Sequence, residues 1–339
     1  MTATFYVGDA IEVMSKLPEK SVDLVLTSPP FLALRSYLPA DHPDKPLEGG
    51  SQSTPGEFID WLLDVVEACA RVLAPHGSLC FELGDTYADS GGPGGDYNKG
   101  GLREGQPKWD RPQKRFEGNK AIEAKSGGGG RPRPVGPGWA MAKSLSLVPE
   151  SFRWAMVYGM NPFTGRTTDR WRLRNVIRWV RPNPPVGALG DKFRPATSEL
   201  MVFCKSATRF FDLDAVRYQS DYHRASLYLN KETPPGQRPN MSQHTVNAAG
   251  APPLDWWSIS PANYKGAHYA VWPPALLEKP IKAMCPLGGT VLDPFVGSGT
   301  TLAVASGLGR NAIGIDLDAR NFDLALDRVG PFILSKGAA

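Results

Sequence analysis

The chain has 339 residues, 41% of them hydrophobic, which is enough for one large globular domain with insertions or for two domains. The 38 Lys and Arg residues exceed the 34 Asp and Glu residues by four, so the charge permits an anionic partner such as nucleic acid without requiring one. Four scattered cysteines argue against a disulfide framework or a metal site. Together with the lack of a signal peptide or an apolar run of ~18 residues, they predict a soluble cytoplasmic protein.

The first predicted strand covers residues 4–7 and leads directly to Gly8 and Asp9. Apolar residues then recur at helical spacing between 11 and 17, which predicts a short helix. Asp9 is therefore expected at the carboxyl end of a strand.

A second strand is predicted at 21–27, where an apolar run ends in the sequence Ser-Pro-Pro-Phe. Two successive prolines fix the backbone and remove two donors, so the turn is stiff and its carbonyls are left to accept hydrogen bonds. A hydroxyl, aimed carbonyls and an aromatic ring suit an exocyclic amino group on a flat ring. The competing interpretation is a stiff turn whose ring is part of the core. The residues concerned are Ser28, Pro29, Pro30 and Phe31.

Pro and Gly residues between 32 and 53 predict a mobile loop able to close over a substrate. The sequence Thr-Pro-Gly-Glu at 54–57 is typical of a capped helix start, and the residues after it place apolar side chains on one helical face. This helix is expected to end at 75–77, and residues 78–83 are expected to form another buried strand.

The composition then changes to Gly and Pro up to residue 149, which predicts an insertion. Residues 99–133 contain ten Lys or Arg and four Asp or Glu, so the basic surplus of the chain is concentrated here. Two interpretations are open: a solvated linker, or a clamp on the DNA backbone that becomes ordered on binding.

Residues 152–158 are predicted to be helical and residues 198–204 to form a strand. In residues 171–180 the apolar residues fit partly the spacing of a helix and partly that of a strand. Residues 181–185 form a second proline-stiffened loop. Aromatic and basic residues alternate irregularly through 205–261, which suits contact with nucleic acid, although the aromatics of a small subdomain core would give the same composition.

The carboxyl-terminal part has the pattern of a βαβ unit. Strands at 290–293 and 311–316 flank a Gly-rich loop and a helix at 300–309, and the strands end in Asp293 and Asp316. The spacing is close to the roughly 20 residues that put an acid on a ribose in nucleotide-binding folds. The loop lacks the Lys of a phosphate loop and the third Gly of the dinucleotide fingerprint, which disfavours ATP and NAD. A ribose-bearing ligand without a pyrophosphate remains, and S-adenosylmethionine fits that description.

These motifs together resemble the amino-group DNA methyltransferases of bacteria and phages, which methylate N4 of cytosine or N6 of adenine. Residues 27–31 match the catalytic loop of that family, residues 293–301 match its cofactor loop, and Asp316 matches its ribose-binding acid. Residues 268–276 resemble the segment that wraps the methionine part of the cofactor, and Asp9 matches an acidic position near the adenine.

The resemblance implies a catalytic set and a cofactor-binding set for S-adenosyl-L-methionine. The catalytic set is Ser28, Pro29, Pro30 and Phe31. The cofactor-binding set is Asp9, Thr27, His268, Trp272, Pro273, Asp293, Phe295, Gly297, Ser298, Gly299, Thr300 and Asp316.

The motif order is that of the permuted β group, with the catalytic loop near the amino terminus and the cofactor loop near the carboxyl terminus. The implied fold is the α/β, Rossmann-like fold of S-adenosylmethionine-dependent methyltransferases, with a mostly parallel seven-stranded sheet and helices on both faces. The resemblance implies five parts. Residues 1–84 are the catalytic half of the methyltransferase domain, 85–150 are a basic insertion, and 151–204 continue the methyltransferase domain. Residues 205–262 are the target-recognition region, and 263–339 are the cofactor-binding half. Double-stranded DNA is the expected partner, with a cognate restriction endonuclease as a second; monomer and homodimer both stay open.

The expected chemistry is direct methyl transfer to a base flipped out of the duplex and stacked on Phe31. The Ser28 hydroxyl and the Pro29 carbonyl accept hydrogen bonds from the amino group, and no His and acid partner is identified that would make Ser28 a nucleophile. None of the four cysteines follows a proline, which disfavours methylation at carbon 5 of cytosine. Ser28 favours cytosine over adenine by the resemblance. A non-catalytic DNA-bound regulator and an NAD oxidoreductase are the alternatives, and calorimetry with the two cofactors would separate them.

Overall fold

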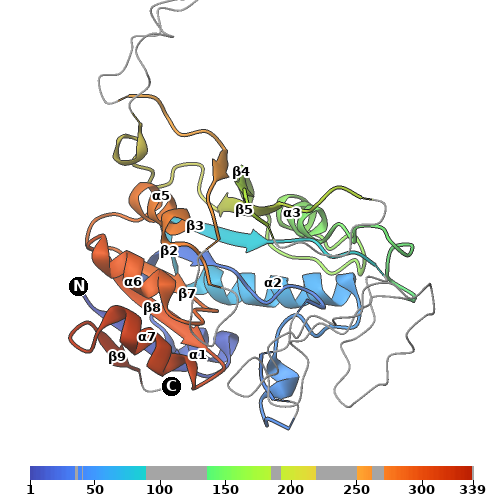
Figure 1. Ribbon diagram of the computed structural model, residues 1–339, viewed down its shortest axis with the longest axis horizontal. Coiled ribbons are helices and arrows are strands. Elements are labelled where there is room, and N and C mark those ends of the chain that lie inside the picture. The colour runs from blue at the N-terminus through green and yellow to red at the C-terminus, as the bar shows by residue number, and fades with distance from the viewer. Residues whose placement is uncertain are drawn as a thin grey trace, which may run out of the picture.

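A nine-stranded sheet lies at the centre of the described part of the chain, in the order β6-β4-β5-β3-β2-β7-β8-β1-β9 (Figure 1). The computed structural model describes residues 1–34, 37–39, 41–88, 136–184, 192–218, 250–261 and 271–337. The strands are β1 (Ala3–Val7), β2 (Val22–Thr27), β3 (Leu73–Leu83), β4 (Arg172–Val180), β5 (Thr197–Cys204), β6 (Trp256–Ser258), β7 (Thr290–Asp293), β8 (Asn311–Asp316) and β9 (Leu334–Lys336). The helices are α1 (Ala10–Lys16), α2 (Pro55–Val72), α3 (Val148–Tyr158), α5 (Pro274–Met284), α6 (Thr300–Gly307) and α7 (Asn321–Val329).

The sheet is mostly parallel. Strands β3, β2, β7, β8, β1 and β9 run in the same direction along the order of the sheet, and β5 is antiparallel to both β3 and β4. Because the carboxyl ends of parallel strands meet at one edge, the residues that follow β1, β2, β3, β7 and β8 gather there. This edge carries the candidate site.

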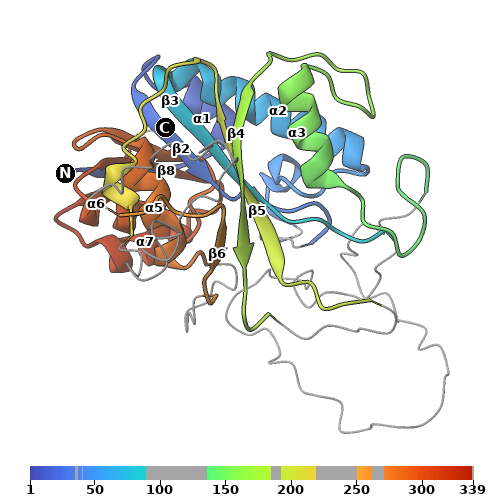
Figure 2. The same cartoon turned by 90° about the horizontal axis from the view of Figure 1, so that it is seen from above.

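Helices cover both faces of the sheet, with α1, α2 and α3 on one face and α5, α6 and α7 on the other (Figure 2). Each face of the sheet has its own hydrophobic core, and alternate residues of a strand pack into one core or the other. In β2, Val25 packs with the first helix layer, whereas Leu24 and Leu26 pack with the second. Strands buried on both faces need apolar residues at nearly every position, which explains the continuous apolar runs in the sequence.

Helix α2 begins as its sequence predicts. The Thr54 side chain accepts a hydrogen bond from the Glu57 backbone N–H, and Pro55 occupies the first turn. The side chain of Glu57 accepts a hydrogen bond from the Ser53 N–H at 3.0 Å, one residue before the N-cap, so it ties the incoming chain to the first turn of the helix. The face from Phe58 to Val72 is buried against the sheet.

The structure corrects three details of the sequence interpretation. The sheet has nine strands instead of seven because the three-residue strands β6 and β9 extend its two edges. Helix α2 ends at Val72, before the predicted Pro-His-Gly stop, because Leu73 is already extended and pairs with Val22. Residues 171–180, whose apolar spacing fitted neither a helix nor a strand throughout, contain β4. An irregularity between Leu173 and Asn175 shifts the pairing register of β4 with β5 by one residue.

No helix in the ranges given above is long and apolar enough to cross a membrane. The division of the chain into methyltransferase parts, insertion and target-recognition region stays a prediction. Residues 89–135 and 219–249 lie outside the described residues, and with them all of the basic segment 99–133 and much of the predicted recognition region.

Candidate active site

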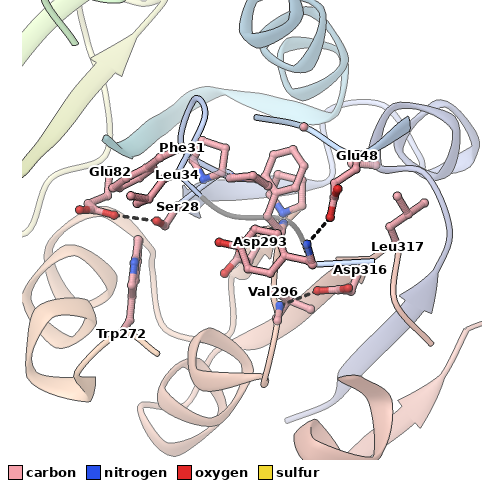
Figure 3. Close-up of a pocket in the computed structure, with 18 of the residues that line it drawn as sticks. Ser28, Phe31, Leu34, Glu48, Glu82, Trp272, Asp293, Val296, Asp316 and Leu317 are labelled. Carbon is pink, nitrogen blue, oxygen red and sulfur yellow. Dashed lines mark hydrogen bonds between the residues drawn. The ribbon is translucent and has the colours of Figure 1, made fainter. Parts of the chain in front are cut away.

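A cavity of about 490 Å³ opens at the carboxyl ends of the parallel strands. It is lined by the loop after β2, by the ends of β3, β7 and β8, by the turn after β1 and by residues just before α5. Figure 3 shows that Ser28, Glu82 and Trp272 gather at one side of this cavity, and that Asp316, Leu317 and Glu48 lie at the other. The cavity therefore has two chemically different regions within one space.

The Ser28 region is built by strand pairing. Thr27 pairs with Phe81 across β2 and β3, so the next residues of the two strands, Ser28 and Glu82, come side by side. The Ser28 hydroxyl donates a hydrogen bond to Glu82 Oε2 at 2.6 Å. Sequence reasoning found no acid partner for Ser28, and Glu82 is that missing partner. Its one sequence signal was a charged residue inside the otherwise apolar strand 78–83.

Glu82 is almost completely buried, with 2% of its surface exposed. Burial raises the pKa of the Glu82 carboxyl, while hydrogen bonds from Ser198 and Ser28, the charge of Arg181 and the nearby Trp272 indole act in the opposite direction. A buried carboxylate with several donors is a fixed acceptor that can also take up a proton.

The aromatic ring of Phe31 forms part of the cavity wall and is only partly buried. It lies so close to Gly84 that a Cβ atom there would come within 2.7 Å of the ring. Gly84, directly after β3, thus leaves room for the ring beside the Ser28 loop. The Phe31 side chain also packs against the hydrophobic core, so its two interpretations, a ring that contacts a ligand and a part of the core, both stay predictions.

Asp293, at the end of β7, is held by protein groups on several sides. It accepts hydrogen bonds from the hydroxyls of Thr27 at 2.7 Å and Thr301 at 2.6 Å, and from the Phe295 backbone N–H at 3.1 Å. Burial raises the pKa of Asp293 to about 6, although these three hydrogen bonds lower it. The carboxylate joins β2, β7 and α6, which fixes the Gly-rich loop relative to the Ser28 loop.

Asp316, at the end of β8, organises the same loop from the other side. Its Oδ2 accepts from the Gly297 N–H at 2.8 Å, and its Oδ1 accepts from the Asp318 N–H at 2.8 Å. Burial raises the pKa of Asp316 to about 6. Asp316 also lines the cavity, so its carboxylate is presented to a ligand there.

The Gly-rich loop has local reasons for its composition. Gly299 has φ +79°, and a Cβ atom at this position would lie 2.7 Å from Ala325 of α7, so the loop requires glycine here. The hydroxyls of Ser298 and Thr300 accept hydrogen bonds from Arg328 at 3.2 and 2.9 Å, which ties the loop to α7.

The other predicted site residues divide into three groups. Asp9 lines the cavity and caps α1 by accepting from the Glu12 N–H at 2.9 Å. Residues predicted for the site that also line the cavity are Pro29, Pro30, Trp272, Phe295, Gly297, Ser298 and Thr300. Residues that are not part of the cavity lining are Thr27, Pro273 and Gly299. His268 lies outside the described residues.

The segment after the Ser28 loop covers part of the cavity. Glu48, which is buried, accepts hydrogen bonds from the Tyr37 and Leu38 backbone N–H groups and pairs with Lys45. Leu34, Tyr37, Leu38, Leu47 and Glu48 all line the cavity. Sequence reasoning predicted a loop able to close over a substrate but did not identify Glu48, whose contacts depend on the fold of the loop.

The sequence of the chain matches DNA methyltransferases when it is compared with known proteins. The DNA methylase family model N6_N4_Mtase matches residues 22–327. The chain is 27% identical to the type II methyltransferase M.Cfr9I of Citrobacter freundii and 29% identical to M.XycI of Xanthomonas campestris pv. cyanopsidis, in each case over 96% of this chain and 87% of the relative.

Two solved structures share the fold. The PvuII DNA methyltransferase, named as cytosine-N4-specific, aligns with a TM-score of 0.59 at 17% identity, over 97% of this chain and 86% of that one. A putative DNA modification methylase of Thermus thermophilus, solved as a complex with S-adenosyl-L-methionine, aligns with a TM-score of 0.52 at 20% identity over 100% of both chains. Because the family model matches most of its length, the chain belongs to the N6/N4 DNA methylase family.

Proposed function

We propose that the protein is a site-specific DNA methyltransferase that methylates the exocyclic N4 amino group of cytosine, with S-adenosyl-L-methionine as the methyl donor. The observation that carries the proposal is the Ser28–Glu82 hydrogen bond of 2.6 Å, placed in the same cavity as the loop held by Asp316. One region suits an aromatic amino group and the other suits a ribose-bearing ligand.

The cofactor supplies an electrophilic methyl group on a sulfonium. In this proposal Asp316 accepts hydrogen bonds from the ribose hydroxyls, because each of its oxygens holds one backbone N–H and keeps further lone pairs for a ligand. Asp9 lies near the adenine, and the backbone of the Gly-rich loop allows close approach. The residues assigned to the remainder of the cofactor are Trp272, Asp293, Phe295, Gly297, Ser298, Thr300 and His268. Thr27, Pro273 and Gly299, which are not part of the cavity lining, support these residues.

The target base must leave the duplex to reach Ser28, since an amino group inside the stack is out of reach of the cavity. There Phe31 stacks on the base, and the Ser28 oxygen and the Pro29 carbonyl accept the two N–H bonds of the amino group. Such bonds favour a tetrahedral nitrogen with an available lone pair, which stabilises the transition state more than the ground state.

The Ser28–Glu82 pair also provides a route for the proton that the amino group must lose. When the nitrogen–methyl bond forms, the nitrogen becomes cationic and one of its N–H bonds breaks. The proton goes to Ser28 Oγ, and the original hydroxyl proton of Ser28 goes to the Glu82 carboxylate. Ser28 keeps its hydroxyl throughout, and Glu82 ends in its neutral form until the proton reaches solvent.

Cytosine is favoured over adenine because position 28 is serine followed by Pro-Pro-Phe. In the family that the sequence resembles, aspartate at this place accompanies adenine methylation more often. Adenine N6 is the second candidate, since both bases present two N–H donors and a hydroxyl accepts from either. In this proposal residues 205–262 read the target sequence, and a restriction endonuclease of matching specificity is the expected companion.

Methylation-sensitive sequencing of a bacterial host that expresses the protein tests this proposal. A host expressing Ser28→Ala at the same level is the control. The expected result is modified cytosine at one short recurrent sequence in the first host and none in the second. Unmodified DNA in both hosts, with folded and abundant protein, would contradict the proposed activity.

A further inference from the structure

The carboxylate of Glu82 needs an electrostatic partner in order to be ionised inside the cavity wall. It is buried between β2 and β5, and burial alone favours its neutral form. The groups that act on it are the Ser28 hydroxyl from the end of β2, Ser198 from β5, Trp272 from the segment before α5, and Arg181 from the end of β4. Arg181 is the one positive charge among these four groups.

Two neighbouring arginines, Arg153 and Arg178, pair with a different carboxylate, Glu199. Successive residues of a strand point to opposite faces, so Ser198 faces Glu82 while Glu199 faces the other side of β5. Glu199 forms ion pairs with Arg153 at 2.7 Å and with Arg178 at 2.5 Å. The two arginines near the end of β4 therefore have different partners: Arg178 forms an ion pair with Glu199, whereas Arg181 donates to Ser198 and its charge acts on Glu82.

Arg181 is held in place by several contacts. Its backbone N–H donates to the Ala196 carbonyl at 2.8 Å, its guanidinium lies 5.1 Å from the centre of the Trp179 ring, and Nη1 donates to Ser198 Oγ at 3.3 Å. Trp179 is itself fixed, because its ring N–H donates to the Ile259 carbonyl at 2.8 Å. Ser198 accepts from Arg181 and bonds Glu82, so it links the guanidinium to the carboxylate.

The charge state of Glu82 decides the direction of the Ser28 hydrogen bond. When Glu82 is ionised, the Ser28 hydroxyl donates to it, and the Ser28 lone pairs point to the amino group as acceptors. A neutral Glu82 can donate to Ser28 instead, and the serine proton is then free to bond the amino nitrogen and engage the lone pair that attacks the methyl group. A neutral Glu82 also cannot take up the proton that the product must lose.

We propose that Arg181 is a positioning residue that favours the ionised form of Glu82, through its charge and through the Ser198 hydroxyl that it holds, so that Ser28 presents an acceptor to the target amino group. The catalytic consequence rests on the proposed function. The effect of Arg181 on Glu82 is a property of this chain alone and is measurable without DNA or cofactor.

Infrared difference spectroscopy of the carboxyl stretch, titrated over pH and assigned by its loss in Glu82→Gln, gives the ionisation midpoint of Glu82. In Arg181→Gln the midpoint is expected to rise by at least about one pH unit, because an opposite charge at close range lowers a carboxyl pKa by one to three units. Arg181→Lys keeps a positive charge and is expected to shift the midpoint less. Arg178→Gln is the matched control, since Arg178 pairs with Glu199, and it is expected to leave the midpoint unchanged.

The pH dependence of kcat/KM for DNA supplies a second readout. The acidic limb of the profile should move to higher pH in Arg181→Gln by the same amount as the infrared midpoint, and the rate should recover at alkaline pH. An unchanged midpoint in a folded Arg181→Gln protein, or an equal shift in Arg178→Gln, would overturn the inference. If the wild type methylates no DNA, the proposed function fails while the infrared titration still decides the role of Arg181.

Discussion

Replacing Ser28 by Ala and Glu82 by Gln, singly and together, tests whether the two residues act as one unit. The 2.6 Å bond joins a hydroxyl to a buried carboxylate, and hydrogen bonds to charged groups contribute about 1.5–3 kcal/mol, which corresponds to roughly a 10- to 150-fold effect on rate. Loss of the proton route adds to this, since general acid–base groups contribute typically 10²–10⁴-fold. Each single variant is therefore expected to lower kcat at least about 100-fold.

The assay is the initial rate of transfer of a labelled methyl group to DNA at saturating cofactor, with calorimetry of cofactor binding as the control. Because the two side chains share one function, the double variant is expected to be no more than a few-fold slower than the slower single variant. Cofactor affinity should stay within about twofold of the wild type in all three proteins. Losses that multiply in the double variant would show that Ser28 and Glu82 act independently and would refute the coupled arrangement.

Three other variants test the remaining assignments. Asp316→Ala should raise the dissociation constant of S-adenosyl-L-methionine at least about tenfold in calorimetry, because a carboxylate on two hydroxyls contributes roughly 1.5–3 kcal/mol; an unchanged constant would place the cofactor elsewhere. Asp293→Asn should remove a pH dependence of stability. The folded-state pKa of about 6 lies above the ordinary 3.8, so ionisation costs the wild type roughly 3 kcal/mol between pH 4 and pH 7. In denaturant titrations the wild-type advantage over this variant should therefore shrink as pH rises, and a constant difference would contradict the burial argument. Deleting residues 99–133 should lower DNA affinity and flatten its salt dependence without changing the recognition sequence, and an unchanged salt slope would identify the segment as a linker.

The residues predicted from sequence are those whose role is marked by their immediate neighbours. Ser28 precedes two prolines, and Asp293 and Asp316 each end an apolar strand, so local pattern placed all three at the edge of the sheet where the cavity lies. The parallel sheet and its two helix layers were predictable for the same reason, because buried strands and capped helices carry local signatures.

The residues that sequence reasoning missed depend on contacts between distant segments. Glu82 is 54 positions from Ser28 and meets it through the register of β2 and β3, which no local pattern encodes. Arg181, after β4, bonds Ser198 of β5, and β5 is the neighbour of the strand β3 that carries Glu82, so the strand order of the sheet brings the charge of Arg181 near Glu82. The mixed period of residues 171–180 has a similar origin, since the register shift in β4 moves its later side chains to the opposite face.

Nucleoside analysis of methylated DNA tests the central claim most directly. Purified protein is incubated with S-adenosyl-L-methionine and DNA that contains the recognition sequence, and the DNA is then digested and analysed by liquid chromatography and mass spectrometry. The account predicts N4-methylcytosine as the new nucleoside, and none from the Ser28→Ala protein. N6-methyladenine as the sole product would contradict the assignment of cytosine and leave the amino-methylation chemistry standing, whereas 5-methylcytosine would contradict the role given to Ser28 and Glu82.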